Sequence, residues 1–429
     1  MSDPFFTVAV PSKNRPSEVD RTLRSVLEQT FENIEVVVCD NSDTAAAAQT
    51  RAVVERFDDA RVRYIRASGR LSMPDNWDHA VAAAKGEYVG ILTDRSVLRR
   101  DALEVVHREI AATDAKLVNW FNDLYARDPA GTAFKRRQST FKRHRFTADE
   151  VLDYFVHGHP KFSPKIVPKL MTSVCHRSIL DAIRSSPVGR CCPPVSPDFT
   201  SGFLMLAHCE WFLTLDESLY VSCGVGNGSA FRRRGELAER FRQDLGMEWV
   251  EMVDRMPSAA CFSHAAVLND LTRIRDMIPD RLPGIEIDRT QYYLGCMYDY
   301  VKTSKHGVRR DEDLSLLLDA LDREPAEIRD RVKATTIFTD ASTPTAAKQV
   351  KEKAKARVRA TIGPTAQPAF DTVFEAMAWD AANPRTPADS SFLDVKPGID
   401  QLRTPTRPKR VKRRTARVWT RLAGARARH

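Results

Sequence analysis

Two carboxylates stand at the points where apolar runs of the sequence end. Asp40 follows the run Ile34–Cys39, and Asp94 closes the stretch that begins at Gly86. Such runs are typical of buried strands, and in an open α/β sheet ligands lie in the crevice outside the carboxyl ends of the strands. Asp94 is therefore positioned to meet a ligand, although Asp also ends strands because it favours turns.

Two basic residues lie in the loop after the first apolar run. Phe5–Val10 is followed by Pro11-Ser12-Lys13-Asn14-Arg15-Pro16, which contains no glycine. A dinucleotide-binding fold would have Gly-x-Gly-x-x-Gly at this point, so the sequence argues against a dehydrogenase. Lys13 and Arg15 can instead pair with phosphate groups. The alternative is that they are ordinary solvated loop residues.

The elements that must position these residues alternate between strand and helix. Strands are expected at 5–10, 34–39, 61–66, in the stretch 86–98 that delivers Asp94, and at 116–121. Helices are expected to begin after Ser17 as the helix cap, after Asp43 and at Asp75. Alternating segments with short connections predict an α/β fold, in which helices cover both faces of a mostly parallel central sheet.

Five short segments occur in order in the first quarter of the chain: Val8–Arg15, Ser25–Thr30, Val36–Ser42, Ala84–Tyr88 and Leu92–Asp94. Together they resemble family 2 glycosyltransferases, whose GT-A fold has a Rossmann-like sheet. The resemblance implies an inverting hexosyltransferase-type enzyme of polysaccharide biosynthesis. Such an enzyme moves a sugar from a nucleotide-diphospho-sugar donor to a hydroxyl of a glycan or lipid-linked acceptor.

The resemblance also implies roles for individual residues. The loop of Pro11, Ser12, Lys13 and Arg15 would line the nucleotide site, and Asp40 would contact the base. Asn76 and Asp75 would contact the donor, while the alternative for this segment is a capping Asp75 beside a packed Trp77. Asp94 and Arg95 would lie at the diphosphate, where a divalent cation, Mg²⁺ or Mn²⁺, offsets the negative charge that develops on the leaving group.

The sequence departs from the family at this cation site. The motif usually has a second acid two positions on, whereas this chain has Asp94-Arg95-Ser96. Three interpretations remain open. Asp94 and Ser96 hold the metal together, Arg95 replaces the metal in part, or the site only binds. The third interpretation makes the chain a catalytically degenerate protein that binds a nucleotide-sugar or a glycan.

Asp198 is the candidate for general base. It follows Pro197 in a segment that leads into a helix, and an acid late in the catalytic domain of this family deprotonates the acceptor hydroxyl. The alternative is an ordinary helix cap, because Asp is favoured at that position. Glu210, Glu217 and His208 are weaker candidates for the same role.

Later segments suggest further domains. We expect a catalytic domain at 1–235, a helical region at 236–382 on the acceptor side or at an oligomer interface, a linker at 383–408 and a basic amphipathic tail at 409–429. The basic stretch at 134–145 reads as a loop, either a flap that closes on phosphates or a solvated surface segment. An amphipathic basic tail favours an anionic membrane surface, with nucleic acid and a solvated end as alternatives.

The composition and the charge distribution argue against several other classes of protein. The net charge is +9, and 11 of the basic residues lie between Gln401 and the end of the chain without an acid among them. The basicity therefore belongs to the tail and argues against a nucleic-acid-binding body. The eight cysteines form no Cys-x-x-Cys pair, so we expect reduced, mostly buried thiols. With no long apolar run and no leader, a cytoplasmic protein, or one peripheral on the inner face of a membrane, is expected.

Overall fold

A computed structural model describes residues 3–128, 131–158, 163–224, 236–304, 310–342 and 368–394. Its centre is a ten-stranded mixed sheet in the order β3-β2-β1-β4-β9-β6-β10-β5, to which β7 and β8 are added beside β6 and β10. Of these strands, β1 to β4, β6 and β10 run in one direction. The predicted α/β fold with a mostly parallel sheet is confirmed.

The strands are β1 (Phe6–Ser12), β2 (Ile34–Asp40), β3 (Val62–Ile65), β4 (Tyr88–Ile91), β5 (Ser96–Leu98), β6 (Leu117–Asp128), β7 (Gly131–Lys135), β8 (Arg143–Thr147), β9 (Ser173–His176) and β10 (Trp211–Cys223). The helices beside the sheet are α1 (Pro16–Leu27), α2 (Thr44–Phe57), α3 (Met73–Ala82), α4 (Ala102–Thr113), α5 (Ala148–His157), α6 (Ser163–Ile166), α7 (Arg177–Arg184) and α8 (Pro197–Ala207), with the short 3-10 turn η1 (Leu170–Thr172).

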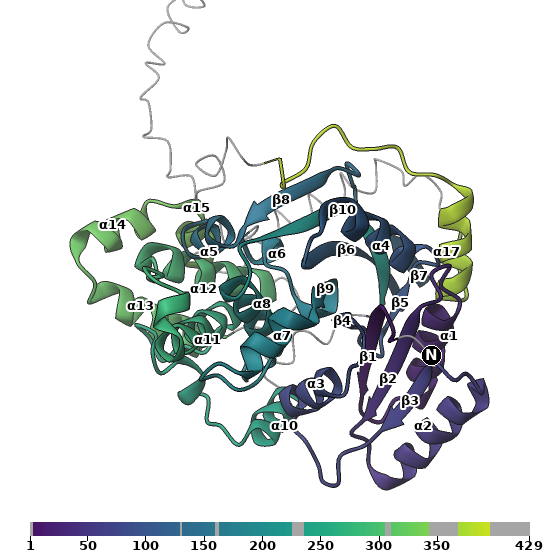
Figure 1. Ribbon diagram of the computed structural model, residues 1–429. Helices are drawn as coiled ribbons and strands as arrows, with labels where there is room; N and C mark the ends of the chain where they lie inside the picture. Colours follow the sequence, from purple (N-terminus) through teal and green to yellow (C-terminus); the bar gives the residue numbers. More distant parts are fainter. Residues whose placement is uncertain are drawn as a thin grey trace, which may run out of the picture.

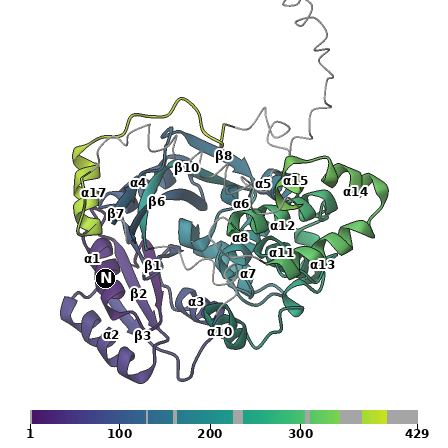
Figure 2. The same cartoon turned by 180° about the vertical axis from the view of Figure 1, so that it is seen from behind.

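The later helices are α10 (Glu236–Leu245), α11 (Ser263–Met277), α12 (Arg289–Ser304), α13 (Asp311–Asp322), α14 (Ala326–Lys333), α15 (Thr336–Ser342) and α17 (Val373–Ala382), with the 3-10 turns η2 (Glu251–Val253) and η3 (Pro279–Arg281). The predicted helical C-terminal region is therefore present. Figure 1 shows most of it, coloured green, beside α7 and α8 and away from α1 and α2, and the view from behind in Figure 2 agrees.

The first strands form because every residue of β1 and β2 is buried between two layers of helices. Their parallel register sets Ser12 opposite Asp40, and Ala9 pairs with Ile91 of β4. The ends of β1, β2 and β4 therefore share one edge of the sheet. Helix α1 begins at Pro16, whose missing N–H costs nothing in the first turn, with Arg15 and not the predicted Ser17 at its N-cap.

The basic stretch at 134–145 is a loop only at residues 136–142, and the prediction is wrong at its two ends. It contains the end of β7 and the start of β8. Its arginines pair with buried or half-buried acids: Arg137 Nη2 lies 2.5 Å from Asp216, and Arg143 Nε lies 2.8 Å from Glu109. In the sequence, a run of like charges is typical of a solvated segment. In the structure, four of these residues pair with acids from distant segments: Arg136, Arg137, Lys142 and Arg143.

The segment that ends the described chain lies on the sheet domain. Phe370, Val373 and Ala376 are buried in one cluster with residues of β5, β6 and β10. Beyond α17, Arg385 pairs with the buried Asp123 of β6. Residues 383–394, inside the predicted linker, therefore pack on the first predicted domain, while the domain division itself stays a prediction. The predicted tail at 409–429 lies outside the described residues.

Candidate functional site

Asp94 lies at the sheet edge where β1, β2 and β4 end. Its side chain is 2% exposed. Ser12 Oγ donates a hydrogen bond to it at 2.9 Å, and Arg15 Nη1 lies 3.1 and 3.3 Å from its two oxygens. Thr22 of α1 donates to the main-chain oxygens of both Asp94 and Ser96. Three of the predicted donor-site residues, Ser12, Arg15 and Asp94, are therefore in direct contact.

The charges around Asp94 do not balance. Burial raises the pKa of Asp94, while Arg15 and Arg95 act to lower it. Burial also lowers the pKa of Arg95, and the nearby Arg15 adds to that effect. Two guanidinium groups face one carboxylate, and this arrangement favours an additional anion.

The predicted cation ligands can be tested against this arrangement. Ser96 Oγ is 2.9 Å from Thr93 Oγ1, and both oxygens of Asp94 accept hydrogen bonds. Within the described residues no group of three or more His, Cys, Asp or Glu side chains gathers as a metal site. Magnesium commonly uses only one or two carboxylates and keeps waters and substrate phosphates as its other ligands. Asp94 therefore fits a cation that is held mainly by the donor, provided that Arg15 releases one oxygen.

A pocket lies beside the carboxyl ends of β2 and β3. It is about 270 Å³ in volume and is lined by the ends of β2 and β3 with the following loops, from Asp40 to Thr44 and from Arg66 to Arg70. Asp40 accepts a hydrogen bond from Tyr64 Oη at 2.7 Å and from Ser42 N at 3.0 Å. Because its carboxylate is occupied in this way, Asp40 shapes the wall of the pocket. Its contact with a base stays a prediction.

The remaining predicted donor residues differ in their exposure. Pro11 continues β1 and is buried. Asn76 is 5% exposed and exchanges hydrogen bonds with Cys39, so it holds α3 against β2. Lys13 Nζ is 3.2 Å from Asp244 of α10, which also pairs with Arg70. The donor roles of these residues stay predictions.

The packed Trp77 in the alternative interpretation is confirmed, because this side chain is 8% exposed. The capping role of Asp75 is not. Ser72 is the N-cap of α3, and its side chain accepts a hydrogen bond from Asp75 N. Asp75 instead pairs with Arg190 at 2.7 Å.

Asp198 lies in the first turn of α8 and is not its cap, since the N-cap is Ser196. Its carboxylate accepts a hydrogen bond from Lys169 Nζ at 2.8 Å, and its side chain is 30% exposed. The alternative of an ordinary helix cap is therefore wrong. Asp198 is an accessible carboxylate beside one cation, and its role as base stays a prediction.

The weaker candidates for the base are engaged elsewhere. His208 is half-buried, its Nδ1 lies 2.9 Å from Leu204 O, and burial lowers its pKa. Glu217 is buried and pairs with Arg143 at 2.9 Å. Glu210 is exposed just before β10.

The start of α8 is fixed by the helical region. Asp270 of α11 is 1% exposed and accepts hydrogen bonds from Val195 N and Ser196 N, each at 2.9 Å. Burial raises the pKa of Asp270 to about 7. Thr200 Oγ1 also donates to Pro193 O at 2.7 Å. These contacts hold the chain immediately before Asp198.

Close backbone approaches connect α8 to the sheet edge. A Cβ atom on Gly202 of α8 would lie 2.3 Å from Pro168 O, and one on Gly90 of β4 would lie 2.7 Å from Ser173 O. Only glycine permits these contacts. They bring the turn that contains Lys169 close to both α8 and β4.

Sequence reasoning missed Lys169, Asp244 and Asp270. Each comes from a segment that no local motif connects to the sheet edge. The sequence gives one signal for Asp270, which lies between the apolar residues Leu268 and Leu271 of a helical segment. A buried acid in such a segment needs hydrogen-bond partners.

The described residues contain no helix that is long and apolar enough to cross a membrane. All eight cysteines are free, and seven of them are buried. The prediction of mostly buried thiols is confirmed.

Residues 7–161 match the family model described as glycosyl transferase family 2. Among curated proteins, the chain is 24% identical over 122 residues to glycosyltransferase GlyG of Streptococcus pneumoniae, a match that covers 28% of this chain and 40% of GlyG. It is 29% identical over 106 residues to the GalNAc(5)-diNAcBac-PP-undecaprenol beta-1,3-glucosyltransferase of Campylobacter jejuni, covering 24% of this chain and 33% of that protein. The chain thus spans less than half the length of these relatives.

Solved structures are similar at lower identity. S. aureus TarS 1-349 in complex with UDP-GlcNAc has a TM-score of 0.42 and 14% identity, covering 76% of this chain and 90% of that one. The mannosyltransferase PcManGT from Pyrobaculum calidifontis, in complex with GDP-Man and Mn²⁺, has a TM-score of 0.41 and 16% identity, covering 82% and 89%.

Proposed function

From the match of residues 7–161 to glycosyl transferase family 2, we propose that the chain is an inverting glycosyltransferase of this family. Its donor would be a nucleotide-diphospho-sugar and its acceptor a hydroxyl of a glycan or lipid-linked molecule. Lipid-linked acceptors are supported by the Campylobacter jejuni relative, whose name contains PP-undecaprenol. The observation that carries the proposal is the arrangement of Ser12, Arg15, Asp94 and Arg95 at one sheet edge.

In this proposal the nucleotide occupies the pocket lined by Asp40 to Thr44 and Arg66 to Arg70. The diphosphate then extends along the loop of Lys13 and Arg15 towards Asp94. Guanidinium groups bind phosphate oxygens in pairs and remain charged at all ordinary pH values. Arg15 and Arg95 would therefore stabilise the negative charge that develops as the sugar–phosphate bond breaks.

Asp198 would act as general base. The acceptor hydroxyl attacks the anomeric carbon from the face opposite the diphosphate, Asp198 removes its proton, and the bond to the phosphate oxygen breaks with inversion. Lys169 keeps the carboxylate in place before the acceptor arrives. A bound divalent cation on Asp94 and Ser96 would add charge neutralisation at the diphosphate.

The experiment that tests this proposal offers a panel of nucleotide-sugars to the whole chain, with and without lipid-linked acceptors. Turnover that releases the nucleoside diphosphate and changes the anomeric configuration supports an inverting transferase. Thermal protection by a nucleotide-sugar without any turnover would instead support the catalytically degenerate binding protein. Retention of the anomeric configuration would contradict the role of Asp198 as base.

Some predictions rest on the sequence alone. Association with an anionic membrane surface, through residues 409–429, would place the enzyme near a lipid-linked acceptor. An interface between copies of the chain through the helical region is a further proposal. Sedimentation with anionic vesicles, compared between the whole chain and a variant ending at residue 408, tests the first of these.

A further inference from the structure

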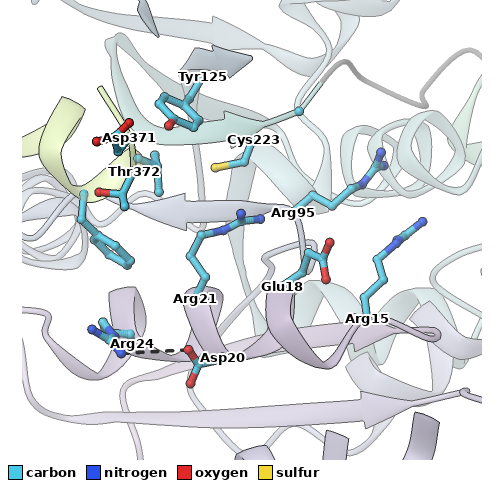
Figure 3. A pocket seen from close by; sticks show the side chains of 13 residues that line it. Arg15, Glu18, Asp20, Arg21, Arg24, Arg95, Tyr125, Cys223, Asp371 and Thr372 are labelled. Carbon is cyan, nitrogen blue, oxygen red and sulfur yellow. Dashed lines mark ion pairs between the residues drawn. The ribbon is translucent and has the colours of Figure 1, made fainter. Parts of the chain in front are cut away.

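A cavity of about 630 Å³ lies beside Arg15 and Arg95, on the side of the first loop away from the Asp40 pocket. Its floor is α1, and its walls are the loop before β5, the ends of β6 and β10, and the start of α17. Figure 3 shows Arg21 rising from α1 into this cavity, with Arg95 beyond it and Cys223 above. The cavity therefore lies between the sheet edge and the segment 368–394.

Two arginines of this cavity each have one nitrogen without a hydrogen-bond partner among the described residues. Nε of Arg21 and Nε of Arg95 are buried without a hydrogen bond, and the structure gives neither side chain an ion pair. An unsatisfied buried polar atom in a folded protein calls for an explanation such as a bound ion. Both groups come from different elements and line one space.

Two of the acids that line the cavity, Glu18 and Asp20, form no ion pair with Arg21. Arg15 is paired with Asp94, while Asp20 pairs with Arg56 and lies 4.0 Å from Arg24. Glu18 accepts a hydrogen bond from Ser17 at 2.7 Å, although it is close enough to Arg95 to raise the pKa of that group. The side of the cavity opposite α1 is partly apolar, with Tyr125, Cys223, Val373 and Phe374.

We propose that this cavity binds a phosphate group at Arg21, in addition to the phosphates of the donor that Arg15 and Arg95 would contact. The ligand class is an organic phosphate or diphosphate, whose apolar part would lie against the wall formed by β10 and α17. Arginine recognises phosphate through paired N–H donors, and the cavity is large enough for a ligand of this class. The inference rests on the proposed function in one respect, because it assigns the donor to the Asp40 pocket.

The test measures binding of inorganic pyrophosphate and of farnesyl diphosphate to the whole chain by calorimetry, with UDP at saturation and without it. Arg21→Gln is the variant, and Arg24→Gln, one turn further along α1 and half-exposed, is the matched control. We expect Arg21→Gln to weaken both probes about tenfold or more, since a charge-assisted hydrogen bond contributes at least this much. Arg24→Gln should change binding by less than about twofold.

The two probes distinguish the source of the phosphate. Tighter binding of farnesyl diphosphate indicates a lipid-linked ligand that uses the apolar wall, and equal binding indicates a free phosphate compound. The melting temperature of Arg21→Gln, compared with that of the parent protein, shows whether Arg21 binds a ligand or stabilises the fold. Without ligand, Arg21→Gln should leave the protein as stable as the parent, because the half-buried Arg21 forms no ion pair within the described residues.

Two results would overturn the inference: undiminished pyrophosphate binding in Arg21→Gln, or complete loss of pyrophosphate binding in the parent protein when UDP saturates it. The second result would mean that the cavity is only part of the donor site. Failure of UDP or nucleotide-sugars to bind would instead refute the proposed function. In that case the measurement without UDP still decides whether Arg21 binds phosphate.

Discussion

Lys169 donates a hydrogen bond to Asp198 at 2.8 Å, and its ammonium group also lies 3.4 Å from the centre of the Phe199 ring. The lysine comes from the turn before η1, whereas Asp198 and Phe199 begin α8. The pair joins two elements that are 29 residues apart in the sequence. It leaves the carboxylate oriented and partly exposed, as a general base requires before its substrate binds.

Replacing Asp198 by Asn should lower the rate of sugar transfer by about 10²- to 10⁴-fold, because no group remains to accept the acceptor's proton. Donor binding should be unchanged, since the predicted donor residues lie on other elements. Transfer rates and calorimetric binding of the nucleotide test the two statements. Glu210→Gln is the control and should retain activity. An active Asp198→Asn enzyme would remove the assignment.

Replacing Asp270 by Asn should reduce transfer without affecting donor binding. An amide offers one acceptor oxygen, so either Val195 N or Ser196 N loses its partner, at a cost of about 1–3 kcal/mol. The start of α8 would then be less well fixed. Asp276→Asn, on the same helix but at the surface, is the control. Equal transfer rates in the parent and Asp270→Asn would show that this contact does not position Asp198.

The same residue gives a pH dependence of stability. The pKa of Asp270 is raised from 3.8 to about 7 by burial, and Arg273 is the charged group that acts to lower it. A raised pKa means that the folded state holds the proton more tightly than the unfolded state. The stability from this group is therefore present below the usual pKa and lost as pH rises through about 7. Urea unfolding between about pH 5 and 8 should show a smaller decline for Asp270→Asn than for the parent.

Asp244 should compete with donor phosphates. It pairs with both Lys13 and Arg70, which border the proposed donor site. Because these side chains are partly exposed, each pair contributes about 1 kcal/mol at most. Asp244→Asn should thus tighten UDP binding by about two- to fivefold at low salt, and the gain should shrink as salt rises. Weaker UDP binding would indicate that Asp244 instead holds Lys13 in its binding position.

Exhaustive chelation tests the cation on Asp94. If Asp94 and Ser96 hold the metal, activity should fall to background and return when Mg²⁺ or Mn²⁺ is added, because the cation offsets charge on the leaving diphosphate. Asp94→Asn should mimic the loss and resist rescue. Undiminished activity after chelation, together with a large loss in Arg95→Gln, would instead favour charge neutralisation by arginine.

Arg385 should be important for stability. It is 11% exposed and pairs with Asp123, which is 1% exposed, and with Asp380. Removing the cation leaves a buried carboxylate with less compensation, which costs about 3–5 kcal/mol. Arg385→Ala should therefore melt at a lower temperature than the parent. The exposed Arg51→Ala should differ from the parent by no more than about 0.5 kcal/mol. If both variants have the same melting temperature as the parent, the contacts beyond α17 contribute little to stability.

The sequence determined the first half of the sheet, because β1, β2 and β4 are mainly apolar runs that are followed by polar residues. Asp94 could be placed at the carboxyl edge for the same reason, and the parallel arrangement of β1, β2 and β4 follows from the helices between them. The family could be recognised because its motifs lie at these strand ends. Such signals are local in the chain, so one sequence suffices to find them.

Only the tertiary structure decided which charges meet. Arg15 with Asp94, Lys169 with Asp198 and Asp270 with the amides before α8 join segments 29 to 79 residues apart. A charge looks the same in sequence whether it is solvated, paired or buried alone, as the basic stretch at 134–145 illustrates. The energy of a charge depends on its burial and its partners, and both are set by how distant segments pack.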